Sequence, residues 1–240
     1  MNETPFARSA AMLGEEALTR LQSARVAVFG VGGVGGYVCE ALVRSGVGTL
    51  DVFDKDEVSV TNLNRQIIAL HSTIGQDKVS VIARRMKDIN PAVIINEHKV
   101  FYLPENAADF DLAQYDFVVD AVDTVAAKIE LAVRCQQLNV PLIAAMGAGN
   151  KLDPSKLQIA DVYKTSVCPL ARAMRTTLRK KGVKRLTVAY STEEPLQPAA
   201  DGPVLEEEKG RRPPGSMAFV PSAMGLLIAS HVVRQIAFGT

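Results

Sequence analysis

A glycine-rich loop near the start of the sequence constrains the fold more than any other feature. The run GVGGVG at residues 30–35 follows a β-rich apolar stretch at residues 25–30 and precedes residues 35–45, whose apolar positions have helical spacing. In a strand, loop and helix of this kind, the missing side chains let phosphate oxygens approach backbone amides at the start of the helix. The sequence therefore predicts a nucleotide-binding loop made by Gly30, Gly32, Gly33 and Gly35.

Strand and helix patterns alternate over the first 150 residues. Further strands are predicted at residues 49–54, 92–99, 115–120 and 141–146, and further helices at residues 74–89 and 125–138. Such alternation is typical of a doubly wound sheet, whose ligands bind beyond the carboxyl ends of the strands. We therefore predict an α/β fold with a mostly parallel sheet and a Rossmann-like glycine loop.

The pattern becomes irregular after residue 147, which predicts a C-terminal extension of the same single domain, residues 1–240. Strands are predicted at residues 157–162 and 186–191, around a helix at residues 169–181. Residues 193–216 contain five prolines and a cluster of charges, which predicts a mobile loop. The apolar residues 223–238 are interrupted by polar side chains, so we expect a buried or subunit-facing helix rather than a membrane span.

Composition narrows the class of protein. A hydrophobic content of 48% allows a sizeable core, and a net charge of +1 gives no bulk attraction to nucleic acid or membrane. Three widely spaced cysteines lack the CxxC pairs of a structural zinc site, so reduced thiols and no zinc are expected. The first ten residues, MNETPFARSA, lack the apolar core of a signal peptide. These features predict a cytoplasmic protein.

The glycine loop is compatible with two kinds of nucleotide, a dinucleotide such as NAD and a nucleoside triphosphate. Asp54 ends the second predicted strand, where an acid binds a ribose hydroxyl in dinucleotide folds, so an NAD-binding domain is one interpretation. The amides and cations that follow favour a triphosphate instead, because hydride transfer needs no such cluster. This group comprises Asn62, Asn64, Arg65, Gln66 and Lys78.

Two carboxylates end the fourth predicted strand, in the sequence VVDAVD. Asp120 and Asp123 would lie near the phosphates, and a carboxylate there can hold Mg²⁺, which neutralises charge as pyrophosphate leaves. Asp123 occupies the more loop-like position. It is therefore the candidate metal ligand.

The segments FGVGGVGG, DVFDKDEV, NLNRQ, Lys78 and DAVD resemble, in order and spacing, the adenylation domain of ubiquitin-activating-like proteins. The resemblance implies that Asp54 holds the ribose, that Arg65 and Lys78 grip the phosphates, and that Asp123 binds Mg²⁺. It also implies a homodimer, because Arg8 matches an N-terminal arginine that reaches the ATP of the partner subunit. The set suits attack of a carboxylate on the α-phosphate, since cations stabilise the growing charge.

The second half of the chain indicates which substrate carboxylate is adenylated. The segments AAMGAGNKLDPSKLQIADVYKTS, CPLARAMRTTLRKKGV and VAYSTEEP resemble the tRNA threonylcarbamoyladenosine dehydratase family. That resemblance implies ATP-dependent adenylation of threonylcarbamoyladenosine on tRNA, followed by ring closure that expels AMP. Enzymes that activate sulfur-carrier proteins are the alternative, although they usually have two CxxC pairs. An NAD-binding oxidoreductase or nucleotide sensor is the third hypothesis, and a cysteine desulfurase or sulfur-acceptor protein is a candidate partner.

A basic stretch at residues 163–191 contains no acidic residue. Such a cluster neutralises phosphates and would seat RNA, whereas the alternative is a solvated helix whose charges only maintain solubility. The candidate RNA-binding residues are Arg172, Arg175, Arg179, Lys180 and Lys181. Cys168 precedes this helix, and we expect an inert thiol there rather than a covalent nucleophile, because cyclisation of an adenylate needs none.

Overall fold

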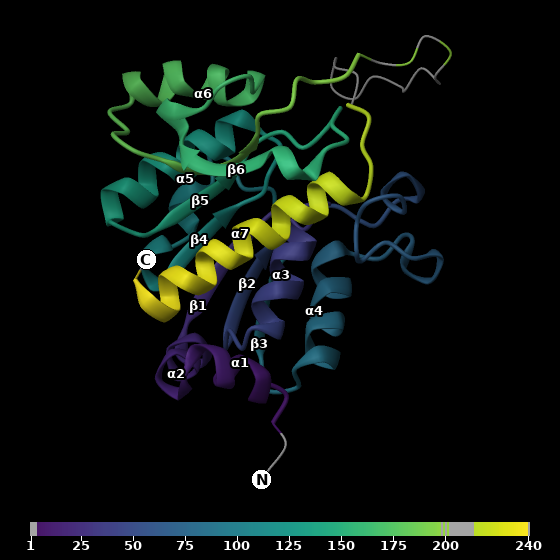
Figure 1. Ribbon diagram of the computed structural model, residues 1–240, viewed down its shortest axis with the longest axis vertical. Coiled ribbons are helices and arrows are strands. Elements are labelled where there is room, and N and C mark those ends of the chain that lie inside the picture. Colours follow the sequence, from purple (N-terminus) through teal and green to yellow (C-terminus); the bar gives the residue numbers. More distant parts are fainter. Residues whose placement is uncertain (1–3, 198, 200, 202–213, 240) are drawn as a thin grey trace.

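A computed structural model describes residues 4–197, 199, 201 and 214–239 of the chain. Its centre is a seven-stranded sheet with the order β3-β2-β1-β4-β5-β7-β6 (Figure 1). The strands are β1 (Arg25–Phe29), β2 (Thr49–Phe53), β3 (Ile94–His98), β4 (Phe117–Asp120), β5 (Leu142–Ala145), β6 (Leu157–Asp161) and β7 (Thr187–Ser191). All neighbours pair in parallel except β6, which runs antiparallel to β7.

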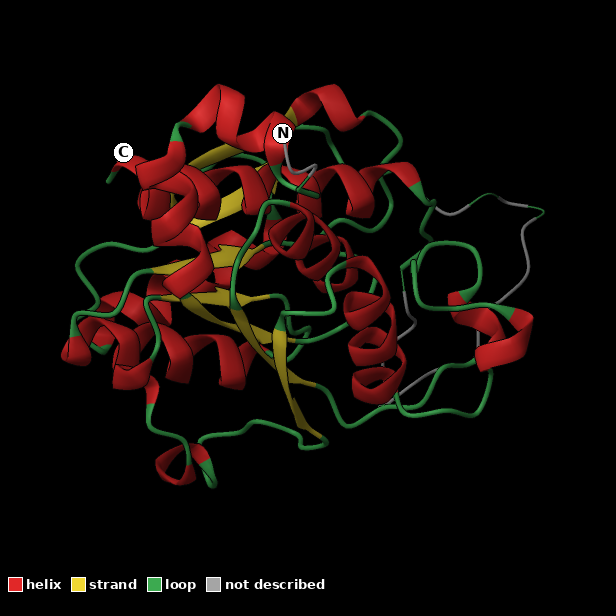
Figure 2. Ribbon diagram, turned by 90° about the horizontal axis from the view of Figure 1, so that it is seen from below, coloured by secondary structure: helices red, strands yellow, loops and turns green. Residues whose placement is uncertain are grey.

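Helices cover both faces of the sheet (Figure 2). They are α1 (Ala7–Leu13), α2 (Glu15–Ser23), α3 (Gly35–Arg44), α4 (Lys78–Ile89), α5 (Val125–Leu138), α6 (Pro169–Lys180) and α7 (Phe219–Phe238). The single 3₁₀ turns lie at Val60–Asn62, His71–Thr73, Ala107–Asp109, Leu112–Gln114, Pro154–Lys156 and Val162–Lys164. Buried residues of α3, α4 and α7 pack on one face, and those of α5 and α6 pack on the other. This arrangement confirms the predicted doubly wound α/β fold.

The predicted elements correspond closely to the observed ones. Helix α5 has the predicted limits and ends at Asn139, whose left-handed backbone (φ 55°) closes the helix. Helix α4 begins at Lys78 rather than at residue 74, because residues 71–73 form a 3₁₀ turn and Gly75 has a positive φ of 80°. The predicted mobile loop at residues 193–216 lies partly outside the described residues, at 198, 200 and 202–213.

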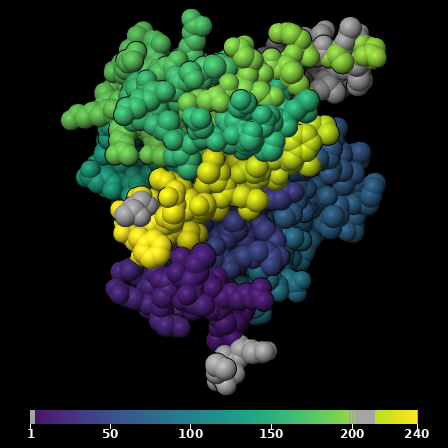
Figure 3. Space-filling model, viewed as in Figure 1, coloured from purple at the N-terminus to yellow at the C-terminus, as the bar shows by residue number. Residues whose placement is uncertain are grey.

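Helix α7 is long and apolar enough to cross a membrane by length and composition, but it packs as a core helix. Met224, Ile228, Ala229 and Val232 are buried in the cluster that α7 shares with α3. Its outer side remains at the surface, where it runs diagonally across the molecule (Figure 3). The helix is therefore buried along one side, as expected for residues 223–238, and begins four residues earlier.

Candidate active site

Two glycines of the loop are required by close packing. Gly30 has a φ of 89°, and a Cβ there would lie 2.7 Å from the carbonyl oxygen of Ala121. A Cβ on Gly35 would lie 1.8 Å from the carbonyl oxygen of Gly30. A side chain at either position would therefore displace backbone, whereas Gly32 and Gly33 have room beside them. The loop thus turns sharply from β1 into α3 and abuts the loop that follows β4.

Asp54 ties the end of β2 to the glycine loop. Its Oδ2 accepts a hydrogen bond from the backbone amide of Val31 at 2.8 Å, and its Oδ1 accepts one from the amide of Asp56 at 2.9 Å. Burial raises the pKa of this carboxyl, and the positive charge of Lys78 and the two amides oppose that rise. The carboxylate therefore lies beside the glycine loop, and both of its oxygens accept hydrogen bonds from the backbone there.

Lys78 lies beside Asp54 because it is the first residue of α4. Only 6% of this residue is exposed, and its Nζ is 3.2 Å from Oδ2 of Asp56 and 3.9 Å from Oδ1 of Asp54. The backbone amide of Lys78 also donates to the carbonyl of Asp56 at 3.0 Å. A buried ammonium group between two carboxylates is a fixed positive charge close to the glycine loop.

The segment at residues 59–66 brings the remaining predicted groups to Gly32 and Gly33. The Arg65 stem lies 3.4 Å from where a Cβ on Gly33 would be, and Nε2 of Gln66 lies 3.8 Å from the equivalent point on Gly32. Gln66 is buried, and its Oε1 has no hydrogen-bond partner among the described residues. An unpaired buried acceptor costs free energy, so it marks a position that suits a donor from a ligand.

Asn62 and Asn64 make contacts within the chain. Asn62 is buried, and its Oδ1 accepts a hydrogen bond from the backbone amide of Ser59 at 3.1 Å. Asn64 is exposed; its Oδ1 accepts from Nη1 of Arg65 at 3.0 Å, and its Nδ2 donates to the carbonyl of Ser216 at 2.9 Å. The polar side chains of this segment are therefore organised by one another before any ligand is considered.

The carboxylate at the end of β4 and the one in the loop that follows have different environments. Asp120 is fully buried and forms an ion pair with Nζ of Lys128 at 2.9 Å, while its Oδ2 has no partner in the described part of the chain. Asp123 is exposed and accepts a hydrogen bond from Oγ1 of Thr124 at 3.2 Å. Of these two carboxylates, Asp123 is open to solvent and Asp120 is not. No group of three or more His, Cys, Asp or Glu residues that could hold a metal occurs among the described residues.

The buried Lys128 was not predicted from the sequence, although it matters to the site. It lies in α5 with no exposed side-chain surface, and its charge faces Asp120 below the glycine loop. Burial raises the pKa of Asp120, and the ammonium group opposes that rise. The only sequence signal is a lysine at a position that the helical pattern of residues 125–138 would place among apolar neighbours.

Arg8 does not join the other site residues. It is exposed on α1, which packs on α2 at the amino-terminal edge of the sheet (Figure 1). Phe6 at the start of α1 lies beside Gly46, which follows the end of α3 that is remote from the glycine loop. Within one chain, Arg8 is therefore on the opposite edge from the nucleotide loop.

The basic helix α6 has a buried apolar side and an exposed charged side. Ala171, Met174 and Leu178 are buried, whereas the exposed basic residues here and in the flanking loops are Lys164, Arg172, Arg179, Lys180, Lys181, Lys184 and Arg185. Arg175 differs from them, because it is half-buried and its Nη1 donates to the carbonyl of Thr165 at 3.1 Å and to its Oγ1 at 2.5 Å. Cys168 is buried at the start of this helix.

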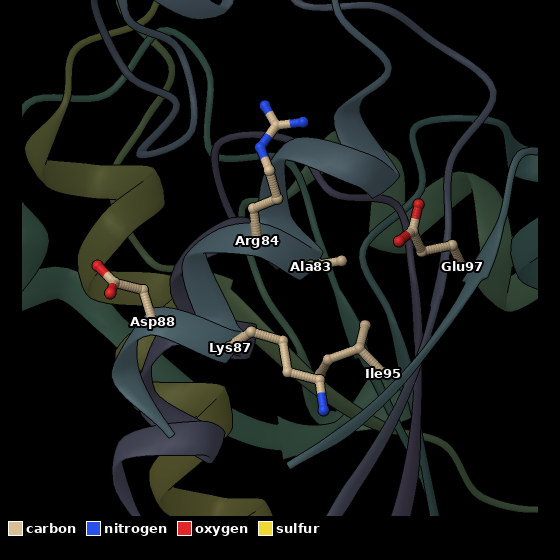
Figure 4. A pocket seen from close by; sticks show the side chains of 6 residues that line it. All are labelled: Ala83, Arg84, Lys87, Asp88, Ile95 and Glu97. Atoms are coloured by element: carbon tan, nitrogen blue, oxygen red, sulfur yellow. The ribbon is translucent and has the colours of Figure 1, made fainter. Parts of the chain in front are cut away.

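A groove of about 490 Å³ lies elsewhere, between α4 and the edge strand β3. Its lining residues are Ala83, Arg84, Lys87, Asp88, Ile95 and Glu97, and their charges alternate in sign around it (Figure 4). Because none of these residues belongs to the glycine loop or the segments beside it, the groove is not the nucleotide site.

Comparisons with known proteins agree with this geometry. The model of the ThiF family matches residues 6–238. The tRNA threonylcarbamoyladenosine dehydratase of Bacillus subtilis (strain 168) is 44% identical, over 96% of this chain and 94% of that protein. The protein of the same name from Escherichia coli (strain K12) is 34% identical, over 96% of this chain and 92% of its own length.

Solved structures give the same result. The crystal structure of the E. coli dehydratase TcdA in complex with AMP matches with a TM-score of 0.87 and 34% identity, covering 97% of this chain and 93% of that one. The structure of the same enzyme in complex with ATP matches equally well, at 33% identity. E. coli MccB with ATP matches with a TM-score of 0.70 at 17% identity, which shows a shared fold.

Proposed function

The chain belongs to the ThiF family, and we propose that it is an ATP-dependent enzyme that dehydrates threonylcarbamoyladenosine in tRNA through an acyl-adenylate intermediate. The observation that carries this proposal is similarity along nearly the whole length of two tRNA threonylcarbamoyladenosine dehydratases, together with a TM-score of 0.87 to one of them bound to AMP. The gathered glycine loop, acid and cations supply the nucleotide chemistry that this reaction needs.

Each nucleotide-site residue has a distinct role in this proposal. The backbone amides of the glycine loop cradle the phosphates, and the carboxylate of Asp54 binds the ribose. Arg65 and Lys78 hold the triphosphate from the other side and stabilise the charge that grows as the substrate carboxylate attacks the α-phosphate. The bond between the α-phosphate and the bridging oxygen then breaks, and pyrophosphate leaves. The side-chain amides of Asn62 and Gln66 complete the wall of the nucleotide site, and Asn64 supports it through its hydrogen bond with Arg65.

Asp123 is the proposed ligand of Mg²⁺. The ion usually keeps several waters and takes only one or two protein carboxylates together with phosphate oxygens, so a single exposed carboxylate beside the glycine loop fits it. When bound, Mg²⁺ would neutralise charge on the leaving pyrophosphate. The neighbouring carboxylate of Asp120 is a poor second ligand for the ion, because it is fully buried and forms an ion pair with Lys128.

The second step takes place within the modified nucleoside. The acyl adenylate carries an activated carbonyl, which a neighbouring group of the same modification attacks, so that the ring closes and AMP leaves. The two steps together remove one water. Because both reacting groups belong to the tRNA, the protein needs only to position the adenylate and exclude competing water.

We further propose a homodimer with composite sites. Arg8 is exposed on the edge of the molecule opposite its own glycine loop, so only the site of a second copy is open to it. The outer side of α7 exposes Leu226 and Phe238, each about half accessible, which would suit a subunit contact. Cytoplasmic location, a single adenylation domain and a cysteine desulfurase or sulfur-acceptor protein as partner remain predictions.

The exposed basic side of α6 is the proposed tRNA surface. Arg172, Arg179, Lys180 and Lys181 present their charges to solvent, where they can neutralise RNA phosphates. Arg179 also lies over the ring of Tyr163, with 5.1 Å between the guanidinium carbon and the ring centroid. Arg175 would contribute less, because its guanidinium group already holds the loop before α6.

The reaction is tested by incubating the purified protein with Mg-ATP and tRNA that carries threonylcarbamoyladenosine, and then weighing the nucleoside after digestion. We expect loss of one water that depends on ATP. Arg65→Ala should lower the rate by about 10²-fold or more, as removal of a charge partner of the transition state does. Arg84→Ala, which changes an arginine on the groove outside the site, is the matched control. An unchanged nucleoside, combined with pyrophosphate exchange that depends on a sulfur-carrier protein, would favour the alternative activity instead.

A further inference from the structure

The guanidinium group of Arg65 forms its hydrogen bonds with the described residues through one nitrogen, Nη1. Its Nη1 donates to the carbonyl of Thr61 at 2.9 Å and to Oδ1 of Asn64 at 3.0 Å, whereas Nη2 and Nε have no hydrogen-bond partner among the described residues. Two acceptors on one nitrogen fix the plane of the group and leave its other edge for phosphate oxygens, which arginine binds in a forked geometry. Asn64 thus contacts Arg65 at Nη1 and leaves the edge made by Nη2 and Nε without a partner among the described residues.

Asn64 is itself fixed by a segment that is distant in sequence. Its Nδ2 donates to the carbonyl of Ser216 at 2.9 Å. The preceding residue, Gly215, accepts a hydrogen bond from the backbone amide of Asn150 at 2.7 Å, and a Cβ on Gly149 would lie 2.7 Å from Pro214. Residues 214–216, which we call the bridge, therefore contact both the Arg65 segment and the loop that follows β5.

The two segments that the bridge contacts follow strands that are not neighbours in the sheet. The Arg65 segment follows β2 and the 149–150 loop follows β5, while β1 and β4 lie between them in the sheet. The glycine loop and the Asp123 loop follow β1 and β4, so the bridge contacts the segments that flank these two loops in the strand order. Asn150 adopts a left-handed backbone with a φ of 56°, which directs its amide to Gly215 and its carbonyl to the amide of Leu196 at 2.8 Å. The bridge is thus held at Gly215 by a backbone hydrogen bond from Asn150 and at Ser216 by the side chain of Asn64.

From these contacts we propose that Asn64 is a positioning residue that links the orientation of Arg65 to the bridge, and through the bridge to the loop after β5. This inference rests on the proposed adenylation reaction. It assigns Asn64 a role through Arg65 rather than through direct contact with ATP. Because Arg65 acts on charge that grows in the transition state, loss of its orientation lowers kcat more than it changes the binding of ATP.

The first test is Asn64→Ala, assayed by dehydration of threonylcarbamoyladenosine in tRNA with varied ATP. We expect kcat to fall about tenfold, less than for Arg65→Ala, with a KM for ATP within about twofold of the unaltered protein. Gln76→Ala is the matched control, because the amide of Gln76 also accepts from an arginine, Arg84, outside the site. A raised KM with unchanged kcat would overturn the inference in favour of direct contact between Asn64 and ATP.

The second test moves the other end of the bridge. Gly149→Ala adds a methyl group against Pro214 and should lower kcat in the same way, although residue 149 does not touch Arg65. The double variant should lose little more than either single variant, because both act on one coupled element. Additive losses would overturn the inference.

Asn64→Asp removes the donor to Ser216 while keeping an acceptor for Arg65. If the Gly149→Ala variant does not fold, Asn64→Asp serves as the second test in its place. We expect a kcat loss comparable to that of Asn64→Ala, and full activity would overturn the link. An unaltered protein that performs no dehydration would count against the proposed function itself, whereas an active protein that is indifferent to these substitutions would count only against the positioning role.

Discussion

Replacing Lys128 by methionine should strongly destabilise the protein near neutral pH. The substitution keeps the length of the side chain but leaves the carboxylate of Asp120 fully buried without the ammonium group that lies 2.9 Å from it in the unaltered protein. Breaking a buried ion pair from one side costs about 3–5 kcal/mol, because the remaining charge is desolvated and unpaired. Since a domain of this kind is stable by roughly 5–15 kcal/mol, the variant would be marginal.

The loss should also depend on pH, with a definite sign. Burial already raises the pKa of Asp120 in the folded protein, and removing Lys128 removes the largest opposing effect. The folded variant then holds a proton that the unfolded chain has released, so its free energy of unfolding falls as pH rises from the ordinary carboxyl pKa through the folded one. The deficit relative to the unaltered protein is therefore greatest near neutral pH and shrinks in acid.

Urea denaturation followed by circular dichroism measures this effect, near neutral pH and again at about pH 5. The double variant Lys128→Met with Asp120→Asn should recover most of the lost free energy, because no unpaired charge remains in the core. A loss below about 1 kcal/mol in the single variant, or a loss that is the same at both pH values, would refute the assignment of a buried charged pair.

Four further substitutions have expected outcomes. Gly35→Ala places a methyl group against the carbonyl of Gly30 and should weaken ATP binding by about tenfold or more in calorimetry; an unchanged Kd would show that the loop can yield. Cys168→Ser should keep its turnover, and mass spectrometry of the intact protein should detect no thioester, whereas an inactive, folded variant would restore a covalent role. Arg175→Gln should lower the free energy of unfolding by about 1–2 kcal/mol, since it leaves buried acceptors unpaired. Arg179→Gln should instead weaken tRNA binding and reduce its logarithmic salt slope by about 1, and equal effects of both substitutions on RNA would contradict this division.

Local patterns predicted the fold well because the relevant signals are local. Strands β1, β2 and β4 are short apolar runs, and helix α5 has the limits that its apolar spacing and the following Asn139 indicate. The start of α4 was placed too early, because the apolar residue Ile74 fits a helical pattern although a 3₁₀ turn precedes it. Such a difference is decided by hydrogen bonds to neighbouring loops and not by the pattern itself.

The site was only partly predictable for a different reason. Gly35, Asp54 and Lys78 follow strands or begin helices, so the topology alone brings them together. The contact between Asn64 and Ser216 joins residues 152 positions apart, and no pattern near either residue signals it. Similarly, a lysine in a helix is usually on the surface, so the burial of Lys128 could be seen only once α5 had been packed on the sheet.

The crossing of α7 over α3 has a consequence for when the nucleotide loop can form. A Cβ on Gly225 would lie 2.5 Å from the carbonyl of Val34, and Pro221 lies against Gly33, so the last helix directly supports the loop that is made almost first. During synthesis, nearly 190 further residues follow residues 30–36 before α7 is available to support the loop. A chain cut short before α7 would carry every predicted nucleotide contact in its sequence and still lack a finished binding loop. ATP binding should therefore require that α7 has been made and has packed against α3.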